Sequence, residues 1–207
     1  MSQPSSQMLS QTPARAAVLA DQIFAGEGLL YDAIRVVCAN ILLILCAHII
    51  IPLPWTPVPL TGQTFGVLLV AVLLGSRRSA LVMGMYLAEG ISGLPVFAPI
   101  GLPGVIHLFG PTAGYLLSYP AAAFVTGWLV ERGASRTILR LLGALLLGGI
   151  IILGAGWTWL ALPMHFGWTR AFIAGVLPFL PGDAMKTILV IAAVRGLELA
   201  RREPRVV

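Results

Sequence analysis

The only lysine of the chain, Lys186, lies three residues after Asp183 inside the last apolar stretch. Residues three apart project from the same face of a helix, so this carboxylate and ammonium can act together. A charge at the centre of a membrane costs roughly 2.5–3.5 kcal/mol on insertion scales and often marks a ligand or ion path. Pro178 and Pro181 precede the pair and disrupt the helix, which leaves backbone groups available around it. The pattern favours a binding site at membrane depth; the alternative is an ion pair that only locks helix packing.

Polar side chains in two other segments could join such a site. Gln63 and Thr64 could hydrogen-bond a neutral ligand, although Thr61 beside them could simply cap the helix that begins there. Glu89 is a further deep charge, followed by a glycine-rich loop, and it could line a site entrance or merely reach water. Tyr115 could face a ligand, or belong to the aromatic belt of a membrane protein.

Composition places the elements that carry these residues in a lipid bilayer. The chain is 58% hydrophobic and only 10% charged, with a mean hydropathy of +0.93, whereas ordinary soluble domains are about 25% charged.

Its three histidines have no cysteine or carboxylate at metal-ligand spacing, so we expect no metal. It has no phosphate-binding Gly-x-x-x-x-Gly-Lys-Ser/Thr loop, so it has no such route to ATP hydrolysis.

The apolar runs predict an all-α integral membrane protein with six spans. We expect an N-terminal cytoplasmic tail over residues 1–30 and one membrane domain over residues 31–207. A full span needs about 20 residues, so the second and third spans are short and must be shielded by protein, tilted or broken. The expected spans are about 33–51, 64–75, 79–93, 111–130, 138–162 and 171–194.

The arginines predict the orientation of the bundle. With six spans, eleven of the thirteen basic residues lie on one side, the exceptions being Arg170 and Lys186. The positive-inside rule makes that side cytoplasmic, with both termini inside. The loops at 52–63 and 94–110 carry no Asp, Glu, Lys or Arg and face outward. Because the arginines form separate membrane-edge clusters, the net charge of +5 does not indicate nucleic-acid binding.

Five motifs give the chain a resemblance to a known family. They are TPVPLTGQTFGV at 56–67, LGSRR at 74–78, GLPVF at 93–97, GPTAGY at 110–115 and LPFLPGDAMK at 177–186. In this order and spacing they resemble the BioY family, the biotin-binding S components of energy-coupling-factor (ECF) transporters. The resemblance implies a six-helix bundle in the bacterial cytoplasmic membrane that captures biotin from outside. A transmembrane coupling subunit and two ATPase subunits would drive it, and ATP would be used only by those partners.

Biotin offers two ureido N–H donors and one carbonyl acceptor, which the charged pair could satisfy together. In this hypothesis Asp183 accepts from an N–H and Lys186 donates to the carbonyl, each bond contributing about 1.5–3 kcal/mol. The ligand carboxylate could meet Gln63, Thr64, Arg170 or loop amides. The apolar part of biotin would pack on aromatic side chains, with Glu89 also near the site: Phe65, Phe97, Tyr115 and Trp157.

Two alternatives to a biotin S component stay open. The chain could be an S component for another vitamin, such as thiamine or riboflavin. An intramembrane enzyme would need a second convergent acid, base or nucleophile, and none is evident in the sequence. We therefore expect no catalytic residue and no cofactor, and we expect membrane lipid, the coupling and ATPase subunits and possible further copies of the chain as partners.

Overall fold

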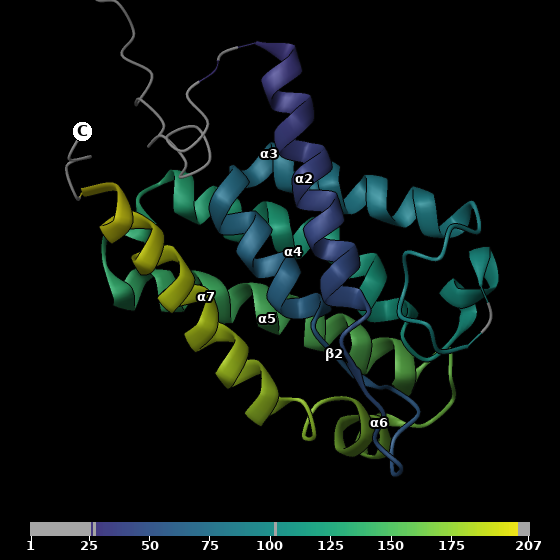
Figure 1. Cartoon of the computed structure of the whole chain (residues 1–207). Coiled ribbons are helices and arrows are strands. Elements are labelled where there is room, and N and C mark those ends of the chain that lie inside the picture. The colour runs from purple at the N-terminus through teal and green to yellow at the C-terminus, as the bar shows by residue number, and fades with distance from the viewer. Residues whose placement is uncertain (1–25, 27, 102, 203–207) are drawn as a thin grey trace, which may run out of the picture.

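The computed structural model describes residue 26 and residues 28–101 and 103–202, and it is built almost entirely from helices (Figure 1). Its two short strands, Ile50–Ile51 (β1) and Leu60–Thr61 (β2), pair antiparallel. The helices are α2 Leu29–Ala47, α3 Gln63–Ile91, η1 Gly104–Phe109, α4 Ala113–Glu131, η2 Ala134–Arg136, α5 Ile138–Ala161, α6 Trp168–Gly175 and α7 Leu180–Arg202. The predicted all-α membrane class is confirmed.

Candidate membrane spans follow from the length and hydropathy of the helices. Four helices, α2 to α5, are long and apolar enough to cross a membrane, and α6 with α7 makes a fifth candidate that is bent by 47°. This measure counts α3 once, although a break inside α3 separates the predicted spans 64–75 and 79–93. The predicted number of six spans therefore stays a prediction.

The break in α3 occurs at Gly75, whose φ of 76° and ψ of −171° suit glycine alone. Figure 1 shows the two halves of α3 running in different directions. Glu131 of α4 accepts hydrogen bonds from the backbone N–H and hydroxyl of Ser76, at 2.8 and 2.9 Å, and so caps the second half. Neighbouring helices shield much of α3, since 67% of its most apolar window is buried. The expectation that these short spans are broken and protected is confirmed.

The first and last predicted spans also have different bounds in the structure. Helix α2 begins at Leu29, inside the predicted tail, and ends at Ala47, before β1. The rest of the predicted tail, residues 1–25 and 27, lies outside the described residues. The last span is divided at 176–179, where Pro178 and Pro181 prevent a continuous helix. The start of α2 and the end of α7 lie on the same side of the molecule (Figure 1).

The bundle has a buried core and an apolar outer surface. Tyr86, Tyr119 and Leu43 are among its largest fully buried side chains. Many leucine and isoleucine side chains of α2, α5 and α7 are instead exposed, and only 28% of the apolar window of α5 is buried. An exposed apolar surface of this extent is expected where helices face hydrocarbon.

Candidate functional site

The predicted charged pair contacts Thr64, which lies 122 positions before Lys186 in the sequence. The Nζ of Lys186 lies 3.0 Å from Oδ1 of Asp183 and donates to the hydroxyl of Thr64 at 2.8 Å. That hydroxyl lies 3.3 Å from the same carboxylate oxygen and donates to it. The side chains of Lys186 and Asp183 are only 11% and 21% exposed. We call Thr64, Asp183 and Lys186 the triad.

The break before α7 positions Asp183. Its backbone N–H donates to the carbonyl of Phe179 at 2.8 Å, and its own carbonyl accepts from the hydroxyl of Thr187 at 2.8 Å. Asp183 lies in the first turn of α7, where the helix dipole favours a negative charge. Pro181 is tolerated in this turn because the first N–H groups of a helix have no partner within it. The sequence therefore places the carboxylate in the first turn of a helix.

The triad forms one wall of a cavity between α3, α4 and α7. The cavity has about 490 Å³ of space, counting the part open at its mouth. Gln63, Thr64, Tyr115, Asp183 and Lys186, all predicted from the sequence, line it. Its other lining residues, which the sequence analysis does not predict, are mostly apolar and include Val58, Leu116, Tyr119, Leu153 and Phe179. Such a mixture of apolar walls and a few polar groups is typical of small-molecule sites.

A buried hydrogen-bond network holds Gln63 at the base of this cavity. The amide nitrogen of Gln63 donates to the hydroxyl of Tyr86 at 2.7 Å. The amide oxygen accepts from Tyr119 at 3.2 Å and from Thr61 at 3.2 Å. Sequence analysis did not identify Tyr86 or Tyr119. The sequence signal that could have found them is a tyrosine within an apolar helix, because a buried tyrosine hydroxyl needs a hydrogen-bond partner.

Tyr115 fixes the cavity wall that faces α6. Its hydroxyl donates to the carbonyl of Gly175 at 2.6 Å, and its ring lies 6.2 Å from that of Phe179. It is buried, so it does not belong to an interfacial belt. Gly156 of α5 lies against this ring, so close that any larger side chain there would collide with it. Tyr115 thus joins α4 to the segment that ends at the α7 break.

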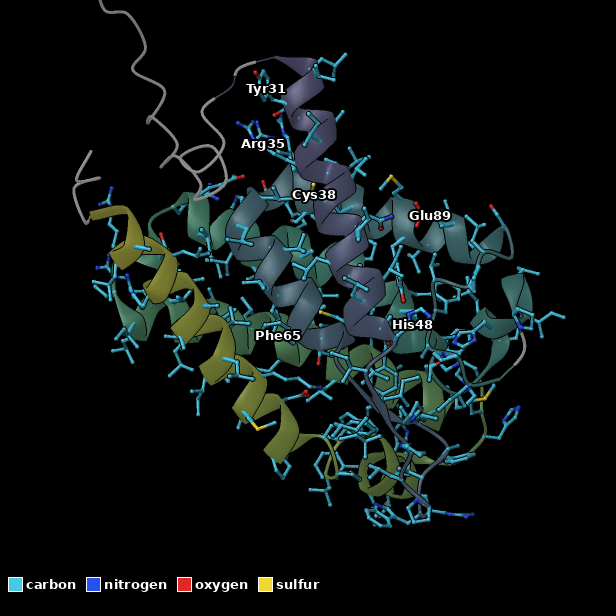
Figure 2. The ribbon with its side chains drawn as sticks, viewed as in Figure 1. Tyr31, Arg35, Cys38, His48, Phe65 and Glu89 are labelled. Atoms are coloured by element: carbon cyan, nitrogen blue, oxygen red, sulfur yellow. The ribbon has the colours of Figure 1, made fainter. Side chains whose placement is uncertain are left out.

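Two predicted site residues, Phe65 and Glu89, lie outside the cavity wall. They come from opposite halves of α3 and are well separated (Figure 2). Phe65 packs against the apolar cluster that contains Leu68 and Leu69. Both carboxylate oxygens of Glu89 lie 2.8 Å from the side-chain nitrogen of Asn40 on α2. Glu89 therefore joins α2 to α3 in this structure.

Phe97 and Trp157 likewise do not line the cavity. Phe97 is buried, and the centroid of its ring lies 5.3 Å from that of Tyr86 and 5.0 Å from that of His107. The indole N–H of Trp157 donates to the carbonyl of Trp168 at 2.9 Å. These aromatic residues pack against other aromatic rings of the molecule, away from the cavity wall.

A second hollow extends the cavity toward the loops that contain no Asp, Glu, Lys or Arg. It has about 690 Å³ of space, counting its open part, and shares Pro59, Ala98, His107 and Thr112 with the cavity. The hydroxyl of Thr112 lies 3.3 Å from Nε2 of His107. We call this hollow the vestibule. It gives the triad a path to the loop side of the molecule.

Residues 15–203 match the BioY family. This chain belongs to the BioY family. A probable biotin transporter BioY of Pyrococcus horikoshii is 41% identical over 142 residues, covering 69% of this chain and 82% of that protein. The biotin transporter BioY of Rhizobium etli is 40% identical over 154 residues, covering 70% of this chain and 80% of that protein. The resemblance noted in the five motifs is therefore confirmed.

The fold of this BioY chain also matches a solved structure. The S component for biotin from an ECF-type ABC transporter superposes with a TM-score of 0.75 at 24% identity, covering 84% of this chain and 93% of that chain. The S-component fold is thus confirmed. In this fold the motif at 56–67 and the motif at 177–186 meet, since Thr64 of the first touches Lys186 of the second. These two BioY motifs build the triad.

Proposed function

We propose that this chain is the substrate-binding S component of an ECF transporter and takes up biotin across the bacterial cytoplasmic membrane. The observation that carries the proposal is the triad in the wall of a cavity of a BioY-family chain. The names of the relatives, which are biotin transporters, support the choice of ligand.

The triad offers the groups that a ureido ring requires. The described hydrogen bonds to the carboxylate side chain of Asp183 all go to Oδ1, so Oδ2 remains to accept from a ureido N–H. An ammonium has three donors, and the described contacts of Lys186 use two of them. The third donates to the ureido carbonyl in our proposal. A carboxylate and an ammonium side by side thus match a ligand that donates and accepts at neighbouring atoms.

The rest of biotin extends along the cavity toward the vestibule. Its apolar ring and chain pack against Tyr115, Leu116 and Phe179, which line the cavity beside the triad. The ligand carboxylate then lies near Thr112 at the junction of cavity and vestibule. Arg170 lies outside both cavity walls, near the ring of Phe166, so we do not assign it to the ligand.

The distribution of charge supports uptake from the loop side. The vestibule opens among the loops that contain no Asp, Glu, Lys or Arg, whereas the arginine clusters lie at the other ends of the helices in the predicted topology. In our proposal both termini are cytoplasmic, a coupling subunit and two ATPases bind from the membrane and the cytoplasm, and the chain itself catalyses no reaction.

Mass spectrometry of the ligand released from the purified full-length protein tests this function. We expect biotin, in a ratio approaching one per chain, after purification from cells grown with biotin. The Asp183→Asn variant, purified in parallel, serves as the matched control and should retain much less. Release of thiamine or riboflavin in place of biotin would show that the chain is an S component for another vitamin.

A further inference from the structure

A third hollow opens on the side of the molecule, between α5 and α7. It has about 980 Å³ of space, counting the part open to its surroundings. Four of its fifteen lining residues are polar, namely the triad and Thr187, and the other eleven are apolar or glycine. We call it the lateral cleft. It reaches the triad, which also lines the cavity.

The polar groups of the lateral cleft are few and are hydrogen-bonded to one another. Thr187 donates to the carbonyl of Asp183, and Lys186 donates to both other members of the triad. The other eleven lining residues offer water no side-chain hydrogen-bond partner. The chemistry of the walls calls for an apolar occupant.

The mouth of the lateral cleft opens onto the lipid-facing surface. Its rim includes Leu146, Ile150 and Ile188, which are 51%, 65% and 65% exposed. These side chains belong to the apolar faces of α5 and α7 that border the bilayer. A hydrocarbon chain can enter here directly from the membrane without crossing water.

The inner end of the lateral cleft is also a wall of the candidate site. Leu153 and the triad line both the cleft and the cavity. We propose that an acyl chain of a membrane phospholipid occupies the lateral cleft and closes the site on its membrane side. The apolar walls and the exposed apolar mouth support this occupant. The inference concerns lipid and does not depend on which vitamin the cavity binds.

Gly149 of α5 provides a way to block the lateral cleft. It lies in the cleft wall, and a Cβ added there would meet no atom within 4 Å. A Gly149→Phe side chain can therefore extend into the space that the acyl chain would fill. Gly143 is the matched control, because it lies on the same helix with equally open surroundings and does not line the cleft.

Photolabelling tests the proposal. The full chain is placed in phosphatidylcholine nanodiscs in which some lipid carries a diazirine on its acyl chain, and labelled residues are mapped by mass spectrometry. Exposed residues will react in any case, so the informative site is Leu153, which lines the inner end of the cleft and is partly buried. We expect labelling at Leu153, reduced several-fold by Gly149→Phe and unchanged by Gly143→Phe.

Three outcomes would overturn the proposal. The first is a wild-type protein labelled only at its exposed surface. The second is inner labelling that Gly149→Phe leaves unchanged in a variant that still elutes as a folded protein. The third is inner labelling that added biotin abolishes, because the ligand and not the lipid would then occupy the cleft.

Discussion

Asp183→Asn should weaken biotin binding by about 10- to 100-fold, the equivalent of one charge-assisted hydrogen bond of about 1.5–3 kcal/mol. The amide can no longer offer a charged acceptor to the ureido N–H. It also leaves the ammonium of Lys186, which is 11% exposed, without its ionic partner. Isothermal titration calorimetry of the purified protein with biotin measures the change.

Glu198→Gln is the control for this experiment. It removes a carboxylate from the same helix, where Glu198 pairs with Arg195 far from the cavity. We expect its affinity for biotin to equal that of the wild type. An Asp183→Asn protein that keeps its helical circular dichroism and binds biotin as tightly as the wild type would contradict the proposed role of the carboxylate.

Gly127→Val should cause the largest loss of stability among single changes in the helix core. A Cβ at Gly127 would lie 2.5 Å from the backbone nitrogen of Ser76 and 2.6 Å from the carbonyl oxygen of Gly75. Backbone atoms cannot rotate aside, so α4 must move away from the break in α3. Overpacking of this kind costs about 1–3 kcal/mol and sometimes more. Thermal unfolding in detergent micelles should show a clearly lower midpoint.

Gly143→Val is the matched control for the crossing of α3 and α4. It makes the same substitution in a helix, so the valine side chain loses the same rotamer freedom. A Cβ at position 143, however, meets no atom within 4 Å. We expect its unfolding midpoint to stay close to that of the wild type. Equal midpoints for the Gly127 and Gly143 variants would mean that the close contact at Gly75 is unimportant for stability.

The helices could be located from hydropathy, but the geometry of the break within α3 could not. The sequence places a loop after Gly75 because Arg77 and Arg78 interrupt the apolar run. In the structure Arg78 pairs with Asp32 of α2 at 2.8 Å, so this charge is satisfied within the bundle and needs no loop. The chain changes direction at Gly75 alone. Partners that lie far apart in sequence determine this outcome, and hydropathy does not contain them.

The polar part of the candidate site was more predictable than its aromatic part. Asp183 and Lys186 are close in sequence and share a helix face, so local spacing was enough to pair them. Phe97 and Trp157 pack against loops and neighbouring helices whose positions follow from the whole fold. The Gln63–Tyr119 contact, across 56 positions of the chain, was missed for the same reason.

In our proposal Lys186 and Asp183 recognise the ureido group of biotin. Calorimetry with biotin and with 2-iminobiotin, in which an imine replaces the ureido carbonyl, tests it most directly when wild type and Lys186→Met are compared. We expect the wild type to prefer biotin strongly, because 2-iminobiotin is a guanidinium at neutral pH and offers the ammonium no acceptor. We expect Lys186→Met to lose most of this preference. An equal preference for biotin in both proteins would show that Lys186 does not recognise the ureido carbonyl.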